Sequence, residues 1–195
     1  MPRVLASPKR MTFEEYLEFE EAAETKHEFV DGFIFAVAGA NNAHNLISGN
    51  IFAIARSAAR STQCRAYMND MKLRTPEPDG QGYYPDVLVV CTPDDFNTNV
   101  KTTACLIIEV LSKSTEDVDR GEKWQNYRKL SSLQAYVLVS QKQKYVEIFR
   151  RMADGSWRYE ALENNETLDL PCINASMTLD DIYEDVDFSA REDSE

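Results

Sequence analysis

The sequence contains no apolar run long enough to cross a membrane. A transmembrane helix needs about 20 consecutive apolar residues, and no segment of the 195-residue chain approaches that length. Residues 1–10 include basic side chains but lack the apolar stretch of a secretory signal. The sequence therefore gives no indication of membrane insertion or export, and we expect a cytoplasmic protein without a membrane partner.

The four cysteines lack the close spacing of a metal-binding motif. They are scattered along the chain, and two of them fall in segments predicted to be buried strands. In a cytoplasmic protein this pattern is typical of reduced thiols packed in the interior. We therefore expect four free cysteines, namely Cys64, Cys91, Cys105 and Cys172.

The chain also lacks an excess of positive charge. Its formal net charge is −12, which argues against a broad electrostatic surface for duplex DNA. Residues 180–195 hold eight acidic side chains and one arginine, hence −7, which leaves −5 for residues 1–179. A local basic strip that contacts phosphates remains compatible with this distribution.

No internal repeat, low-complexity block or linker divides the chain. Its apolar and aromatic fractions, 43% and 10%, are those of a globular protein. We expect a flexible lead over residues 1–10, a single domain over residues 11–187 and an acidic tail over residues 188–195.

The apolar periodicity predicts an α/β (α+β) fold. The central order is helix, strand, strand, strand, helix, strand, with a hairpin added at each end of the chain. The predicted strands over residues 84–91 and 104–111 are joined by a short loop. This loop favours an antiparallel pair and so a mixed sheet. The predicted helices cover residues 13–23, 41–60, 114–130 and 179–183, and the predicted strands cover residues 27–37 (a hairpin), 63–67, 71–74, 84–91, 104–111, 135–140, 144–150 and 157–162.

Two of these strands each carry one carboxylate in an otherwise apolar run. Asp86 stands near the start of the first, and Glu109 stands inside the second. A buried carboxylate is costly unless it is paired or bound to a metal ion. The helix that follows carries Lys123 and Tyr127 one turn apart, on the same face. Two acids and a lysine at one place would form a divalent-metal site for phosphodiester hydrolysis.

Mg²⁺ is the expected cofactor, with Mn²⁺ as the alternative. Mg²⁺ is commonly held by one or two carboxylates while it keeps several waters. Asp86 and Glu109 would supply the carboxylates, and the carbonyl of Val110 would add a backbone ligand. Lys123 would orient the attacking water or stabilise the transition state, while Tyr127 would hold the lysine or contact a phosphate.

Taken together, these motifs resemble the Uma family of proposed endonucleases. The resemblance covers residues 11–183 and implies the PD-(D/E)XK superfamily with its restriction-endonuclease-like fold. In that family Asp86 and Glu109 would match the paired acids, and Lys123 would supply the lysine from the next helix. The motifs that carry the resemblance are Asp31-Gly32, His44, Pro85-Asp86-Val87, Glu109-Val110-Leu111-Ser112, Ser114-Thr115 and the segment from Asp119 to Tyr127.

Two positions depart from the family pattern. Lys113 stands where the family usually has proline, and Phe33 stands where it usually has glutamate. If the strand continues, Lys113 lies on the same face of it as Glu109. Lys113 is then an alternative to Lys123 as the lysine of the site. Phe33 removes an acid that would have supported the site.

The remaining candidates have weaker patterns. His44 is a candidate metal ligand or phosphate contact, although a capping or packing role is equally compatible with its place at a helix start. Glu28 is a minor candidate for a third acid, with a hairpin salt bridge as its simpler explanation. Lys113, Arg120 and Arg128 are candidate phosphate contacts, against the default of a solvated helix face.

The sequence thus predicts a metal-dependent, nuclease-like phosphodiester hydrolase. Its partner would be nucleic acid, DNA in preference to RNA, and by analogy with restriction-like folds it would be a homodimer. The alternative is a catalytically silent module that binds nucleic acid or protein and retains the fold. A hydrolase of a small phosphorylated substrate would suit the acidic charge but lacks a glycine-rich phosphate loop.

Overall fold

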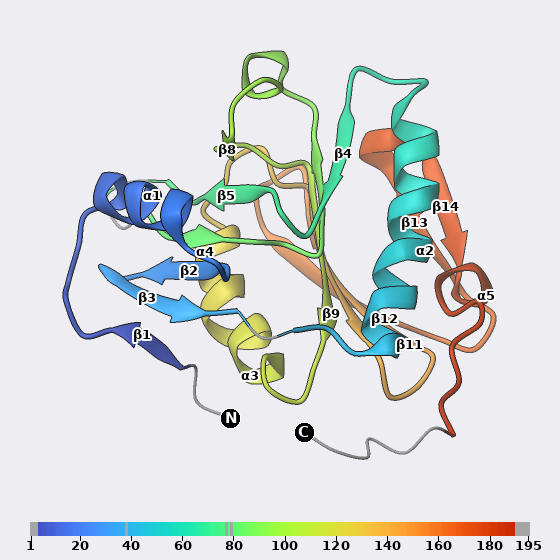
Figure 1. The fold of residues 1–195 in the computed structure, drawn as a ribbon. Helices are drawn as coiled ribbons and strands as arrows, with labels where there is room; N and C mark the ends of the chain where they lie inside the picture. The colour runs from blue at the N-terminus through green and yellow to red at the C-terminus, as the bar shows by residue number, and fades with distance from the viewer. Residues whose placement is uncertain (1–3, 38, 77, 79, 190–195) are drawn as a thin grey trace.

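Two six-stranded sheets organise the fold. The computed structural model describes residues 4–37, 39–76, 78 and 80–189 (Figure 1). The central sheet has the order β12-β11-β10-β9-β7-β4, and β9 and β10 are parallel while its other neighbours are antiparallel. The predicted antiparallel pairing of the two acid-bearing strands is confirmed. The strands are β4 (Arg65–Met68), β7 (Val87–Val90), β9 (Leu106–Leu111), β10 (Ala135–Ser140), β11 (Tyr145–Arg151) and β12 (Trp157–Glu163).

The second sheet contains the predicted N-terminal hairpin. Asp31 and Gly32 form its turn with φ of 51° and 85°, the left-handed conformations that an Asp-Gly turn favours. The sheet has the order β1-β3-β2-β6-β5-β8. Its strands are β1 (Leu5–Ser7), β2 (His27–Val30), β3 (Phe33–Ala36), β5 (Lys72–Arg74), β6 (Gly82–Tyr83) and β8 (Val100–Lys101).

The structure describes most of the predicted lead but little of the predicted tail. Residues 5–7 form β1, which pairs with β3, so a flexible lead is wrong for this segment because the edge of the hairpin offers it a ladder partner. Residues 1–3 and 190–195 lie outside the described part of the chain. Of the expected acidic tail only residues 188 and 189 are described, and the ring of Phe188 lies 5.5 Å from that of Tyr183.

Three of the helices follow residues whose side chains cap them. The predicted first helix is α1 (Phe13–Ala22), whose Thr12 and Glu15 form a capping box. The predicted long helix is α2 (Asn42–Ala59), capped by the side chain of Asn41. The short α5 (Leu179–Ile182) also agrees with the prediction. No helix of the described chain is both long and apolar enough to cross a membrane.

The helix predicted over residues 114–130 is interrupted. It consists of α3 (Glu116–Val118), the π-helical segment η2 (Asp119–Lys123) and α4 (Trp124–Tyr127). A π-helical segment is rare and is frequently found at functional sites. Apolar periodicity alone did not reveal it.

Some elements were not predicted because their sequences are short. The hairpin of β13 (Thr167–Leu170) and β14 (Ala175–Thr178) packs beside α2 (Figure 1). The single turns η1 (Pro93–Asp95) and η3 (Pro171–Ile173) begin at prolines. Runs of three or four residues offer too few positions for a period to be recognised.

Opposite faces of the central sheet pack against different elements. Val87 and Val89 share one apolar cluster with Ile47 and Ile51 of α2. Leu88 shares another cluster with residues of the second sheet and of α4. The central strands are therefore covered on both faces, as their continuous apolar sequences require.

The expectation of four free cysteines is wrong in this structure. Cys64 is bonded to Cys91, and Cys105 is bonded to Cys172. The partners are 27 and 67 residues apart, and the antiparallel pairing of β4, β7 and β9 together with the packing of η3 brings them together. Sequence spacing does not carry that information.

Candidate active site

Asp86 and Glu109 lie opposite each other on neighbouring strands. Val87 of β7 pairs with Ile108 of β9, so the next position of the ladder sets Asp86 beside Glu109. The N–H of Asp86 donates to Oε2 of Glu109 at 3.3 Å, and the N–H of Val110 donates to Oδ2 of Asp86 at 2.7 Å. The two carboxylates are thus held by the backbone of the sheet.

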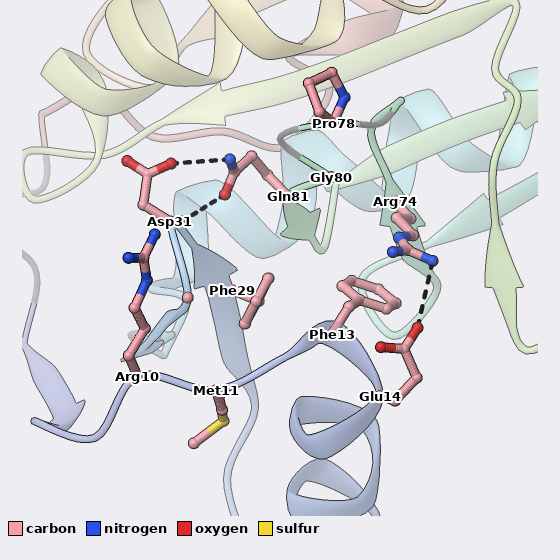
Figure 2. Close-up of a pocket in the computed structure, with 11 residues that line it drawn as sticks. Arg10, Met11, Phe13, Glu14, Phe29, Asp31, Arg74, Pro78, Gly80 and Gln81 are labelled. Carbon is pink, nitrogen blue, oxygen red and sulfur yellow. Dashed lines mark hydrogen bonds and ion pairs between the residues drawn. The ribbon is translucent and has the colours of Figure 1, made fainter.

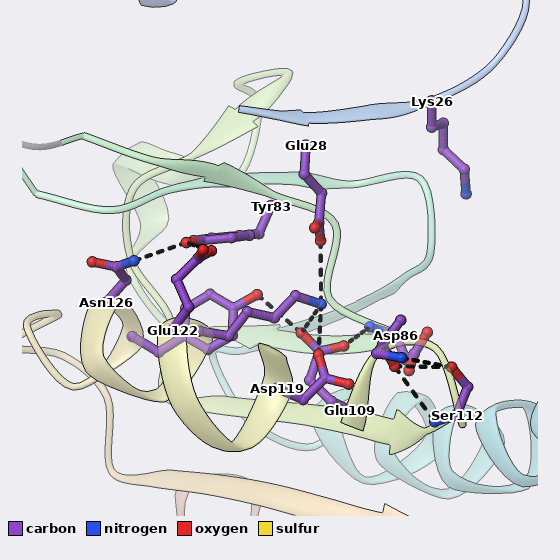
Figure 3. Close-up of polar contacts among 12 residues, drawn as sticks. Lys26, Glu28, Tyr83, Asp86, Glu109, Ser112, Asp119, Glu122 and Asn126 are labelled. Carbon is purple, nitrogen blue, oxygen red and sulfur yellow. Dashed lines mark hydrogen bonds and ion pairs between the residues drawn. The ribbon is translucent and has the colours of Figure 1, made fainter. Parts of the chain in front are cut away.

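The ammonium group of Lys123 lies among the carboxylates of Glu28, Glu109 and Asp119, which are labelled in Figure 3. Its Nζ is 3.1 Å from Oε1 of Glu109, 3.0 Å from Oδ1 of Asp119 and 3.2 Å from Oε1 of Glu28. Lys123 itself is only 5% exposed. The structure therefore brings Glu28, the minor candidate, into the site. We call Glu28, Asp86, Glu109 and Asp119 the acid cluster.

Asp119 was not singled out as a site residue from the sequence. It is 1% exposed and stands four residues before Lys123, at an ion-pairing spacing. Its position in the π-helical segment η2 turns it and Lys123 toward β9. The spacing from Asp119 to Lys123 was the available signal, but it is common on solvated helices.

A layer of tyrosine and amide groups supports the cluster. The hydroxyl of Tyr127, which is fully buried, donates to Oε1 of Glu109 at 2.9 Å. Behind it, the amide of Asn126 donates to the hydroxyl of Tyr83 at 2.8 Å, and that hydroxyl donates to Glu122 at 2.9 Å. Figure 3 shows Asn126 of α4, Glu122 of η2 and Tyr83 of β6 converging.

His44 contacts the same carboxylate oxygen of Asp86 that accepts from Val110. Its Nε2 lies 3.1 Å from Oδ2 of Asp86, and it stands in the first turn of α2. Burial alone would lower the pKa of His44, but the hydrogen bond and charge of Asp86 outweigh burial and raise it. This arrangement makes His44 a group that orients Asp86.

The cluster carries more negative charge than its one lysine neutralises. Burial is the largest cause that raises the pKa of Glu109 well above its usual value. Lys123 opposes this rise, and the neighbouring carboxylates add to it. Burial would lower the pKa of Lys123, but the surrounding carboxylates raise it well above its usual value. Burial also raises the pKa of Tyr127, so its hydroxyl stays protonated and can donate.

The three predicted phosphate contacts lie outside this cluster. Lys113 is exposed in the turn after β9, because the strand ends at Leu111. Arg120 forms ion pairs with Glu116 and Glu147. Arg128 is exposed just after α4. Of the two rival lysines, the structure thus places Lys123 rather than Lys113 beside Glu109.

A cavity of about 350 Å³ lies elsewhere, against the N-terminal hairpin. Figure 2 shows it between the start of α1, the hairpin turn and the loop before β6, where Gln81 exchanges two hydrogen bonds with Asp31. Residues of the acid cluster do not line it. Its position therefore offers no support for the candidate chemistry, which rests on the arrangement of charged groups.

The acid cluster supplies the hard oxygen donors that Mg²⁺ prefers. Oδ1 of Asp119 is buried and has no hydrogen-bond partner in the described part of the chain, although it lies 3.0 Å from the Lys123 ammonium. Within the described ranges, however, three carboxylate or imidazole ligand atoms do not gather within 4.8 Å of one another. The carboxylate oxygens are of the type that binds Mg²⁺. In this arrangement, however, the ammonium of Lys123 already stands between them.

Comparison with known proteins gives concordant results. The Uma2 family, described as "Putative restriction endonuclease", matches residues 13–180. Two uncharacterized proteins of Synechocystis sp. (strain PCC 6803) are similar. The protein slr1290 is 34% identical over 181 residues, which cover 92% of this chain and 94% of that protein. The protein sll1609 is 34% identical over 157 residues, which cover 79% and 88%.

A solved structure shares the fold. The crystal structure of a "putative nuclease belonging to DUF820" from Anabaena variabilis superposes with a TM-score of 0.73, covering 89% of this chain and 97% of that one at 16% identity. The expected mixed α+β fold of restriction-endonuclease-like type is thereby confirmed. The family match spans most of the chain, and the chain therefore belongs to the Uma2 family of restriction-endonuclease-like proteins.

Proposed function

We propose that this protein is a metal-dependent endonuclease of the PD-(D/E)XK type. One observation carries the proposal: Asp86, Glu109 and Lys123 come from three elements and meet at one place. Lys123 Nζ is 3.1 Å from Glu109, and Glu109 is 3.3 Å from the Asp86 backbone. Burying two acids and a lysine together is costly for stability alone, and membership of a nuclease-like family supports a catalytic purpose.

Asp86, Glu109 and the carbonyl of Val110 would hold the cation. Val110 directs its N–H to Asp86, and the N–H and C=O of one strand residue point toward the same neighbouring strand. The carbonyl of Val110 is therefore on the side of the two carboxylates. These oxygen donors suit Mg²⁺, with Mn²⁺ as the alternative.

The side chains around the carboxylates would organise the reaction. When bound, Mg²⁺ would neutralise charge that develops on the phosphate oxygens and favour ionisation of the attacking water. Lys123 would place its ammonium beside the phosphate and stabilise the pentavalent transition state. Tyr127 fixes one oxygen of Glu109 and His44 fixes one oxygen of Asp86, so both act as positioning residues. For His44 we propose this role in place of the candidate contact with metal or phosphate.

The substrate in this proposal is nucleic acid, DNA in preference to RNA. Lys113 and Arg128 are exposed and available to phosphates, whereas Arg120 is engaged by Glu116 and Glu147. By analogy with restriction-like folds, two copies would act together to cut both strands. Cytoplasmic residence would follow from such a substrate.

A second candidate function is a silent interaction module. The observation that favours it is the Lys123 ammonium, which already occupies the centre of Glu28, Glu109 and Asp119. The net charge of −12 also opposes contact with nucleic acid. In this alternative the acid cluster would be a buried ion-pair network with no cation to bind.

Titration calorimetry with Mg²⁺ and Mn²⁺ separates the two functions. The wild type and the double variant Asp86→Ala/Glu109→Ala are titrated, and each is then incubated with plasmid and single-stranded substrates. Saturable binding and cleavage that both disappear in the variant are the expected result. Absence of metal binding in a folded wild type would overturn the nuclease and favour the interaction module.

A further inference from the structure

All four cysteines of the chain gather at a second site. Cys64 immediately precedes β4, Cys91 follows β7, Cys105 precedes β9 and Cys172 lies in η3. The sulfurs of Cys91 and Cys105, which belong to different bonded pairs, are 3.2 Å apart. The Sγ atoms of Cys64, Cys91 and Cys105 all lie within 4.8 Å of one another. We call these four residues the cysteine cluster.

The cysteine cluster lies at the opposite end of the strands that carry the acid cluster. Asp86 precedes β7 and Cys91 follows it, while Cys105 stands four residues before Glu109. At about 3.3 Å per strand residue, the two clusters are about 13–17 Å apart along the strands. They are therefore separate sites, and no residue belongs to both.

The two disulfides lie so close together that their four sulfurs, once reduced, can share one cation. Each disulfide needs only its own two sulfurs. The contact between Cys91 and Cys105 is therefore not required for either disulfide to form. A tetrahedral zinc site, with Zn–S bonds of about 2.3 Å, needs four sulfurs that are about 3.8 Å from one another. Three of the sulfurs, those of Cys64, Cys91 and Cys105, already lie within 4.8 Å of one another, and Cys172 is joined to this group through its bond to Cys105.

The donor set and its access point to the class of metal. Reduction of the two disulfides turns the clustered side chains into thiols, and soft thiolates select Zn²⁺ over Mg²⁺. Cys91 and Cys172 are half-buried, and a cavity of about 360 Å³ borders Cys105 and Cys172. A small reductant and a metal ion can therefore reach the sulfurs.

We propose that the cysteine cluster, once reduced, binds one Zn²⁺ ion through four thiolates and that disulfide formation abolishes this site. A dithiol reductant transfers two electrons and two protons to each disulfide, which becomes two thiols, while the dithiol becomes a disulfide. Two dithiol molecules thus yield four thiols. Binding of Zn²⁺ then displaces the thiol protons into solvent. The metal replaces both crosslinks by joining the ends of β4, β7 and β9 to η3.

Cobalt(II) is the probe for this site, because its absorption reports the ligands. The full chain is reduced with a dithiol, freed of reductant without air and titrated with Co²⁺. Expected are the sulfur-to-cobalt charge-transfer band and the visible bands of a tetrahedral four-thiolate site, saturating at one ion per chain and lost on addition of Zn²⁺. The oxidised chain shows none of these bands.

Variants distinguish the two clusters and keep failure of this proposal separate from failure of the nuclease. Cys91→Ser and Cys172→Ser, at the two half-buried positions, lose the four-thiolate spectrum. Asp86→Ala/Glu109→Ala retains it. A reduced wild type that is folded by circular dichroism but gives no thiolate band overturns the proposal. If reduction unfolds the chain, Zn²⁺ must restore the circular dichroism of the folded state, and failure to do so also overturns it.

Discussion

The two ends of β7 and β9 present opposite metal chemistries. At one end Asp86 and Glu109 offer hard oxygen donors around an ammonium group. At the other end Cys91 and Cys105 would offer soft sulfur donors once their disulfides are reduced. Mg²⁺ prefers the first set and Zn²⁺ the second. In the two proposals, the same pair of strands therefore binds different cations at its two ends.

The two ends also differ in how they are built. The end with the acid cluster, which we call the acid end, is held by backbone hydrogen bonds of the sheet and by the η2–α4 helical segment. Most of it is buried. The end with the cysteine cluster, which we call the sulfur end, depends on η3 and on the loop of residues 92–103, which joins β7 to β9. A site fixed by sheet pairing is preorganised, whereas a site assembled by loops depends on the local stability of those loops. Substitutions at one end should therefore leave the other end intact.

The largest expected effect comes from neutralising the acid end. Asp86→Asn together with Glu109→Gln preserves the shapes of both side chains but removes their charges. Loss of a single preorganised electrostatic group costs about 10²–10³-fold in kcat, so we expect at least that loss of cleavage and no heat of Mg²⁺ binding.

The control for this variant is Asp117→Asn, an exposed carboxylate on α3. It should cleave as the wild type does. The cobalt spectrum of the reduced double variant should also be unchanged, since the cysteine cluster keeps all its ligands. Cleavage by the double variant at the wild-type rate would disprove a role for these acids.

The next effect is a loss of stability when the internal cation is removed. Lys123→Met leaves Glu28, Glu109 and Asp119 without their ammonium. Breaking a buried ion pair by removing one partner costs about 3–5 kcal/mol of unfolding free energy. Urea unfolding should show this loss, and Mg²⁺ should restore part of it because a bound cation stabilises the folded state.

Lys113→Met is the matched lysine control. Lys113 is exposed in a turn, so its replacement should change the unfolding free energy by less than about 0.5 kcal/mol. Equal effects of the two substitutions would contradict the assignment of Lys123 as the lysine of the site.

A smaller effect is expected from the hydroxyl that supports Glu109. Tyr127→Phe removes one hydrogen bond to Oε1 but keeps the packed ring. Groups that orient a metal ligand typically contribute about 10–100-fold to metal affinity, and calorimetry should show the Kd for Mg²⁺ rising by that factor. Tyr183→Phe is the control, because its hydroxyl donates to the backbone carbonyls of Ser140 and Tyr145. An unchanged Kd in Tyr127→Phe would remove the positioning role.

The sequence predicted the acid end far better than the sulfur end, for a physical reason. Asp86 and Glu109 each interrupt an apolar strand, and a charged residue within an apolar run can be recognised from the sequence alone. Strand pairing then follows from the short loop between them. The helix over residues 114–130 was also predicted, but its π-helical turn was not, since one extra residue in a turn barely alters the apolar period.

The cysteine cluster was missed because cysteine is itself apolar. Cys64, Cys91 and Cys105 read as ordinary core residues at strand ends, and Cys172 lies far along the chain. Their proximity depends on the register Arg65↔Val90 and on where η3 packs. Such information is tertiary, and spacing along the chain does not contain it.

The smallest expected effect tests the loop at the sulfur end. Asp95, which is 5% exposed, accepts hydrogen bonds from the backbones of Thr102 and Thr103 and so closes the loop between Cys91 and Cys105. Asp95→Asn should cost about 1–3 kcal/mol of unfolding free energy, because amide oxygen and nitrogen cannot replace a carboxylate there. The Kd for Mg²⁺ at the acid end should stay at the wild-type value.

The dependence on pH separates a charged Asp95 from a merely packed one. Burial alone would raise the pKa of Asp95, but the hydrogen bonds from Thr102, Thr103 and Thr98 together outweigh burial and lower it; the nearby cation is Lys101. A lowered folded pKa contributes stability that is present above the unfolded value of about 3.9 and is lost as the pH falls through the folded value. The stability difference between wild type and Asp95→Asn should therefore be full at neutral pH and shrink in acid, as measured by urea midpoints. A difference that is constant with pH would show that the loop needs the shape of this side chain and not its charge, and the sulfur end would then owe its geometry to packing alone.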